Sequence, residues 1–172
     1  MARVSGDKKD FSLIKDNCSS IAVCYGLNSN KVDGISTWNE IVFYKKQTPN
    51  ITINDVRNAV FDDINRQVKE NILNGFIWKG INVHLSKERQ QMFVNLKNTF
   101  DSKDLPIRVK LGNDILGNPS YYVFNNYDEL CAFCKSMTEY IYKCLQRGWC
   151  QKDSIDWCDY IEEMRKMNIQ QK

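Results

Sequence analysis

The chain has 172 residues, which is enough for one domain with a hydrophobic core and a smaller additional segment. Its 24 basic and 21 acidic residues leave a formal charge of +3, too small to indicate binding to nucleic acid or to an anionic membrane. No apolar run approaches the roughly 20 residues of a membrane-spanning helix, and residues 1–10 lack the apolar segment of a secretory signal. We therefore expect a protein made in a cytosol, with its seven cysteines reduced.

Residues 1–36 are polar and turn-rich, apart from a β-like run at Ser20–Tyr25. We expect them to form an N-terminal arm or hairpin that contributes more to contacts between chains than to the core of its own chain. In this interpretation Ile21–Tyr25 adds a strand to the sheet edge of a neighbouring molecule. Residues 1–17 would then be dispensable for folding.

Regular structure is predicted from residue 38 onward. Trp38–Lys45 carries β-branched and aromatic residues and precedes Pro49, which indicates a strand and a turn. Thr52 followed by Asp55 is typical of a helix start, with Asp in place of the usual Glu. Apolar residues then recur at helical spacing: Ile53, Val56, Val60, Ile64, Val68 and Ile72. We expect Gly75 to end this helix in the left-handed conformation.

A hairpin is predicted directly after that glycine. Strand-forming residues surround a short turn at Lys79-Gly80: Phe76, Trp78, Ile81, Val83 and Leu85. Ser86 is a favourable N-cap for a helix that extends to about Phe100. We expect Trp78, Phe93 and Leu130 to share one core.

The C-terminal part predicts a second hairpin and two more helices. Leu105–Leu111 alternates apolar and basic residues, and Tyr121–Phe124 forms the returning strand. A helix follows from Asn126 until Gly148 closes it, and a last helix begins near Asp153. The fold class is α+β, with antiparallel hairpins packed against about four α-helices. We expect one compact domain, residues 37–172, in addition to the arm.

His84 is the only histidine and would have to be the general base of any triad-type enzyme. No nucleophile motif accompanies it, so an exposed or hydrogen-bonded strand histidine is the favoured interpretation. The carboxylate pairs are Asp62-Asp63, Asp128-Glu129 and Glu162-Glu163. Adjacent helical residues point to different sides, so these pairs indicate solvated faces. We predict no enzyme, no catalytic or cofactor-binding residue and no small-molecule substrate.

Two further groups have a structural and a functional interpretation. Cys131 and Cys134 share one helical face and are expected in the core, but with Cys150 and Cys158 they could form a four-cysteine zinc site. We expect seven free thiols and no metal, which thiol labelling and metal analysis can check. Arg108, Lys110 and Tyr121-Tyr122 could form a basic, aromatic surface, although ordinary cross-strand pairing explains them as well.

A series of motifs spanning Trp38 to Trp157 agrees in order and spacing with a known pattern. It comprises the W-x-E-I-V-F-Y strand, the G-F-x-W hairpin at Gly75, L-S-x-E-x-Q-x-x-F from Leu85, and the Leu130–Gly148 helix. In this the chain resembles a domain of unknown function that recurs in tailed-bacteriophage virion and tail-fibre-associated proteins. The resemblance covers about two-thirds of the chain, and the Asn113–Pro119 turn is specific to this sequence.

The resemblance implies a virion structural module, such as a small neck or tail ring protein of a podovirus-like phage, made in the bacterial host cytoplasm. Its expected partners are other virion proteins and copies of itself, without direct nucleic-acid or membrane binding. The alternative is a phage assembly chaperone or adaptor that never enters the particle. A zinc-dependent nucleic-acid-binding module is a minor third hypothesis.

Overall fold

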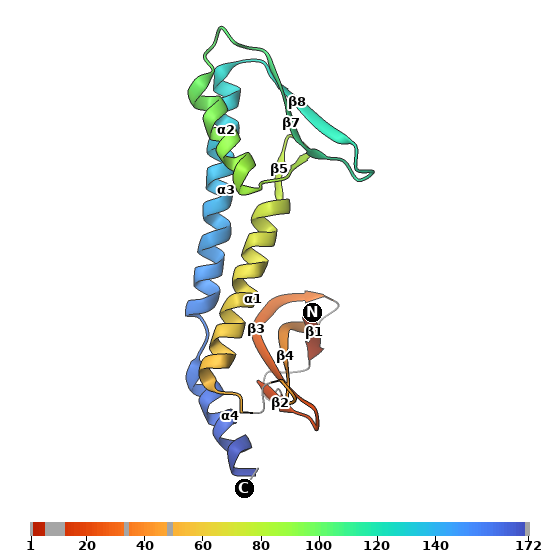
Figure 1. Cartoon of the computed structure of the whole chain (residues 1–172), viewed down its shortest axis with the longest axis vertical. Helices are drawn as coiled ribbons and strands as arrows, with labels where there is room; N and C mark the ends of the chain where they lie inside the picture. The colour runs from red at the N-terminus through yellow and green to blue at the C-terminus, as the bar shows by residue number, and fades with distance from the viewer. Residues whose placement is uncertain (1, 6–12, 33–34, 48–49, 171–172) are drawn as a thin grey trace. The chain divides into compact units, whose positions relative to one another are not determined.

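The computed structural model describes residues 2–5, 13–32, 35–47 and 50–170. The described residues form helices and antiparallel strands, which confirms the predicted α+β class. The chain divides into two compact units (Figure 1): unit 1 comprises residues 1–64 and 150–172, and unit 2 comprises residues 65–149. The boundary expected after residue 36 lies within a paired strand, Ile35–Tyr44, and the compact units divide the chain at other positions.

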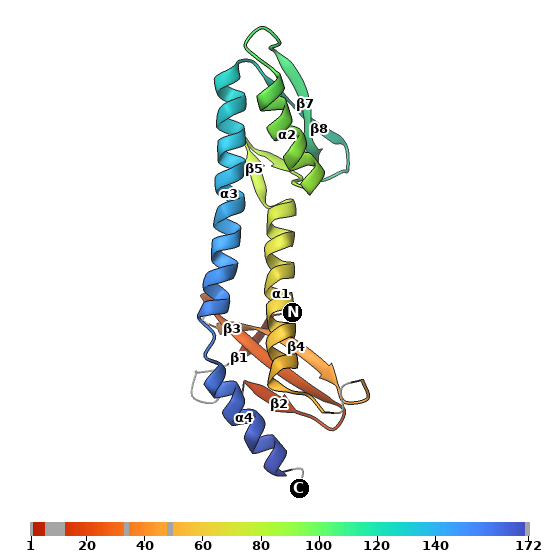
Figure 2. The same ribbon diagram turned by 60° about the vertical axis from the view of Figure 1, so that its left-hand side comes forward.

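Unit 1 contains a four-stranded antiparallel sheet with the order β1-β4-β3-β2 (Figure 2). Its strands are β1 (Ala2–Ser5), β2 (Ile14–Asp16), β3 (Ser20–Val32) and β4 (Ile35–Tyr44). The unit also holds the first part of α1 (Ile53–Asn74) and α4 (Trp157–Gln170). The predicted cap of α1 is confirmed, because the Thr52 amide donates to the Asp55 carboxylate over 2.8 Å.

The expectation that Ile21–Tyr25 adds to a neighbour's sheet is wrong. Ile21–Val23 pair with β2 on one side, Ile21–Tyr25 pair with β4 on the other, and all five residues are buried in unit 1. A strand with a partner along both edges has no free backbone groups with which to extend a second sheet. The segment is therefore part of the core of its own chain.

Helix α4 is joined to this sheet by polar contacts from its inner face. The Glu163 carboxylate accepts hydrogen bonds from the backbone amides of Leu13 and Ile14, at 3.2 and 2.7 Å. The Tyr160 hydroxyl donates to the carbonyl of Cys24 over 2.7 Å. Charge-assisted bonds of this kind contribute more than neutral ones, so α4 and the sheet stabilise each other.

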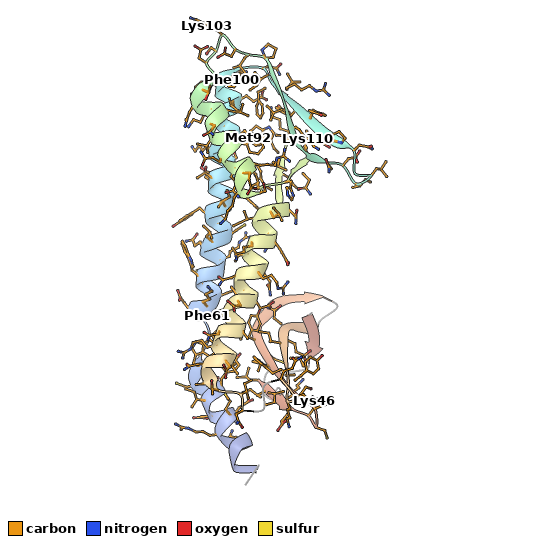
Figure 3. All side chains as sticks on the ribbon, viewed as in Figure 1. Lys46, Phe61, Met92, Phe100, Lys103 and Lys110 are labelled. Carbon is orange, nitrogen blue, oxygen red and sulfur yellow. The ribbon has the colours of Figure 1, made fainter. Side chains whose placement is uncertain are left out.

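An aromatic cluster joins α1 to α4 within unit 1. The rings of Phe61 and Trp157 meet edge to face with their centroids 5.8 Å apart, and the Arg57 guanidinium lies 5.1 Å above the Trp157 ring. Figure 3 labels Phe61 on its helix. The Lys152 ammonium lies 5.2 Å from the centroid of the Phe61 ring, so both aromatic residues have a cation beside them.

Unit 2 contains two antiparallel hairpins and the helices that pack against them. Its remaining elements are β5 (Phe76–Trp78), β6 (Ile81–Val83), α2 (Lys87–Thr99), β7 (Ile107–Asn113), β8 (Pro119–Phe124) and α3 (Tyr127–Asp153). Figures 1 and 2 both show α2 lying along α3. Ser86 caps α2 as predicted, accepting from the amide of Arg89.

The core of unit 2 is built around Phe133 of α3. Phe93 and Leu130 are fully buried in the same cluster, and Trp78 packs against it with its ring 5.3 Å from that of Phe133. The prediction that Trp78, Phe93 and Leu130 share one core is therefore confirmed.

Two glycines behave differently from the sequence-based expectation. Gly75 does end α1, but its φ is not positive. A Cβ there would collide with the hydroxyl of Tyr140 and the carbonyl of Asn71, and that hydroxyl donates to that carbonyl over 2.8 Å. A glycine is thus required at position 75 because Tyr140 and the backbone of Asn71 approach its Cα too closely for a side chain. Gly148 is buried inside α3, which continues to Asp153, so the expected helix end there is wrong.

None of the helices in the described ranges combines the length and the apolar character that crossing a membrane requires.

Candidate functional site

His84 lies just after β6 and is exposed to solvent. Its Nδ1 atom lies 3.2 Å from the side-chain oxygen of Asn74, and its backbone amide donates to the carbonyl of Leu111 over 3.1 Å. The described residues give its ring neither a carboxylate nor a nucleophile partner. The structure therefore places His84 in a polar surface.

The cysteines of the possible zinc site are not brought together. All seven cysteines are free thiols, and no three histidine, cysteine or acidic side chains of the described residues lie close enough to share a metal ion. Cys134 is buried in the core of unit 2, where its Sγ atom lies 3.5 Å from the carbonyl of Phe93. Burial raises the pKa of this thiol, which disfavours the thiolate that zinc would need.

Several polar and basic side chains of unit 2 line one hollow of about 280 Å³, which we call the polar hollow. It lies where β6 and β7 approach each other, beside the end of α1 and the start of α2. Its lining is polar: Asn74, Asn82, His84, Arg89, Lys110, Gly112 and Asn113. None of the described residues that line it is acidic. Sequence reasoning singled out His84 and Lys110 separately but gave no signal that a backbone contact between two hairpins would bring them together.

Gly112 permits that backbone contact. A Cβ atom at this position would collide with the carbonyl oxygen of Asn82 on β6. The adjoining hydrogen bond from the His84 amide to Leu111 holds the two hairpins in this register.

Gly112→Ala is expected to lower the free energy of unfolding by about 1–3 kcal/mol, because the backbone of β6 must move to admit the methyl group. Gly117→Ala is a control for strain without crowding, since nothing lies near a Cβ there although its φ is +86°. Chemical denaturation of both variants measures the two costs. Chemical shifts of Asn82 and Leu111 that change only in Gly112→Ala would locate the crowding, and unchanged shifts would contradict it.

The cations of the polar hollow have no acidic partner among the residues that the structure describes. A guanidinium N–H of Arg89 donates to the backbone carbonyl of Lys110, and partial burial lowers the pKa of Arg89. Arginine nevertheless remains charged at neutral pH. Within the described ranges, neither Arg89 nor Lys110 has a carboxylate at ion-pair distance. The hollow is thus a local concentration of positive charge.

The predicted basic, aromatic surface is divided between the two faces of the β7–β8 hairpin. Arg108 stacks on the ring of Tyr121, with its guanidinium carbon 4.2 Å from the ring centroid, and both are exposed. Tyr122 faces the other way and donates its hydroxyl to Glu129. Only Arg108, Lys110 and Tyr121 therefore share an exposed face.

Glu129 is the centre of a charge cluster in unit 2. Its Oε1 atom accepts from the Lys79 ammonium over 2.5 Å and from the Tyr122 hydroxyl, which together lower its pKa to about 2. The same contacts, Glu129 first, raise the pKa of Lys79 to about 12. Lys79 occupies the hairpin turn with a φ of 45°, so the cluster joins that turn to β8 and to the start of α3. We interpret it as structural.

The Glu129 cluster makes the stability of unit 2 depend on acid pH. Because the folded pKa of about 2 lies below the ordinary 4.5, the stabilisation is complete above pH 4.5 and is lost as the pH falls from 4.5 towards 2. We expect Glu129→Gln to cost about 1–2 kcal/mol at pH 7 and progressively less below pH 4.5.

Denaturant titrations at several pH values measure this difference. Glu139→Gln is the matched control, because its carboxylate lies 4.0 Å from Lys135 in an exposed pair. Equal effects of the two variants would exclude a special role for Glu129.

The β7–β8 turn carries two exposed aliphatic side chains, Ile115 at 101% and Leu116 at 80% exposure. The turn is nevertheless well ordered, because Asp114 accepts from the backbone amides of Leu116 and Asn118, each over 2.8 Å, and from the side-chain amide of Asn118. The bonds from Asn118 are the main cause of the lowered pKa of Asp114. A fixed loop thus presents two apolar side chains to solvent; we call Ile115 and Leu116 the apolar tip.

No protein-family model, curated protein or solved structure matches this chain.

Proposed function

We propose that the chain is a non-enzymatic assembly protein, and specifically a structural component of a tailed-bacteriophage virion. The observation that carries the proposal is the apolar tip, since two adjacent large aliphatic side chains held largely in solvent offer a contiguous apolar surface that a partner can cover. Because Asp114 already fixes the turn, little conformational entropy is lost when a partner binds.

Exposed side chains on β8, the strand that follows the tip, support the same role. Tyr121 and Val123 of β8 expose 45% and 42% of their surface, on the same face of the hairpin. Aromatic side chains such as Tyr121 are enriched in protein interfaces. The resemblance of Trp38–Trp157 to the phage domain is the reason for proposing a tailed-phage particle. In that particle the chain would belong to a neck or tail ring, with other virion proteins or copies of itself as partners.

Changing the apolar tip should reduce assembly without reducing stability. We expect the double variant Ile115→Ser, Leu116→Ser to keep the wild-type melting temperature and to enter particles at least about tenfold less, since each anchor contributes on the order of 1–2 kcal/mol. Mass spectrometry of purified particles, with sedimentation velocity of the isolated chain, measures incorporation and self-association.

Ile77→Ser is the matched control, because Ile77 is 65% exposed in the same unit but lies on the other hairpin. Equal losses from both variants would contradict a specific role of the tip. If the wild-type chain is absent from purified particles, the chain is instead an assembly chaperone or adaptor. A stoichiometric zinc content of the purified chain would favour the third hypothesis, a zinc-dependent nucleic-acid-binding module.

A further inference from the structure

We propose that the polar hollow of unit 2 binds a small ligand that carries a phosphate group, with Lys110, Arg89 and His84 as its principal contacts. This inference goes beyond the assembly function and does not depend on it, because the hollow and the apolar tip consist of different residues.

The charge of the hollow favours an anionic ligand. Some basic residues of the described ranges have an acidic partner, such as Lys45 with Asp16 at 2.6 Å and Lys79 with Glu129 at 2.5 Å. Arg89 and Lys110 have none in the described part of the chain, and they line a concave surface together. Unpaired cations that converge on a hollow attract an anion more strongly than the same charges on a convex surface.

The hydrogen-bond donors of the hollow are held in position by contacts within unit 2. One guanidinium N–H of Arg89 is occupied by the carbonyl of Lys110, and the guanidinium carbon lies 5.7 Å from the centroid of the Phe93 ring. This fixes the plane of the guanidinium and leaves further N–H groups for a ligand. The contact of 3.2 Å with Asn74 likewise orients the imidazole of His84.

The kind of anion follows from the number and type of donors. The hollow combines an ammonium, a guanidinium, an imidazole and three side-chain amides, from Asn74, Asn82 and Asn113. A phosphate group has enough oxygen acceptors to use such a set, whereas a carboxylate has two.

The size and lining of the hollow favour a small ligand over a nucleic-acid strand. A volume of about 280 Å³ lies near the lower end of the range for small-molecule sites. The described lining residues include no phenylalanine, tyrosine or tryptophan, so they offer no platform on which successive bases could stack.

The binding experiment uses the full chain and isothermal titration calorimetry, with inorganic phosphate and a nucleoside monophosphate as separate probes. Lys110→Gln is expected to weaken binding of phosphate about tenfold, since a charge-assisted hydrogen bond is lost. Lys110→Arg should retain most of the affinity because it keeps the charge. Lys103→Gln, which removes the same charge from another exposed site of unit 2, should bind as the wild type does; Figure 3 labels both lysines.

Each outcome has a definite meaning. Tighter binding of the nucleoside monophosphate than of phosphate would assign the ligand to the nucleotides, and equal binding would assign the site to the free anion. Absence of any heat with millimolar phosphate or nucleotide would overturn the proposal, as would equal losses in Lys110→Gln and Lys103→Gln. Preferential binding of a single-stranded oligonucleotide, with a steep dependence on salt, would replace the small ligand by nucleic acid.

Discussion

Phe133→Ala is expected to lower the free energy of unfolding of unit 2 by about 3–5 kcal/mol. Phe133 is fully buried, and its ring centroid lies 4.9 to 5.8 Å from those of Phe76, Trp78, Phe93 and Phe124. Removing the ring forfeits its burial and its aromatic contacts, and leaves a cavity that four large neighbours cannot readily fill.

Urea denaturation monitored by tryptophan fluorescence measures this loss. Ile77→Ala is the control, because Ile77 is 65% exposed and should change stability by less than about 0.5 kcal/mol. If Phe133→Ala costs no more than Ile77→Ala, the aromatic cluster is not the core of unit 2.

Removing residues 1–17 is expected to destabilise unit 1 by about 3–5 kcal/mol or to unfold it. The deletion removes β1 and β2, including the buried side chain of Ile14. It also leaves the Glu163 carboxylate without the amides of Leu13 and Ile14. This reverses the sequence-based expectation that these residues are dispensable for folding.

Circular dichroism melts of the truncated and full-length chains test the deletion. Ile14→Ala separates the buried side chain from the rest of the segment and should cost about 2–4 kcal/mol, whereas the exposed Ser19→Ala should change little. A truncated chain that melts at the full-length temperature would restore the interpretation of an independent arm. A role of residues 1–36 in assembly stays a prediction in either case.

The helices of both units, and the core residues of unit 2 that lie on them, could be predicted because the local spacing of apolar residues determines them. The stripe through Val56, Val60 and Ile64 is buried as its spacing indicates, and so are Phe133 and Met137 on α3. In each case the periodicity of apolar residues matches the period of the helix, so no knowledge of distant partners is needed.

What sequence reasoning missed depends on contacts between distant residues. The polarity of residues 1–36 suggested an arm, yet Ile14 and Ile21–Tyr25 are buried by partners that include α4, more than a hundred positions away. The roles of Gly75 and Gly112 likewise arise from Tyr140 and from the backbone of Asn82. A glycine in a sequence does not reveal whether a turn or a crowded neighbour requires it.

Unit 1 is built from two segments that are separated in the sequence by unit 2, and this affects the order in which the chain can fold during synthesis. Since residues 65–149 form a unit of their own, they can leave the ribosome and fold while α4 has not yet been translated. Until then Cys24 lacks its bond from Tyr160, and the amides of Leu13 and Ile14 lack the Glu163 carboxylate. A nascent chain stalled before residue 157 should therefore carry a protease-resistant middle and a protease-sensitive beginning.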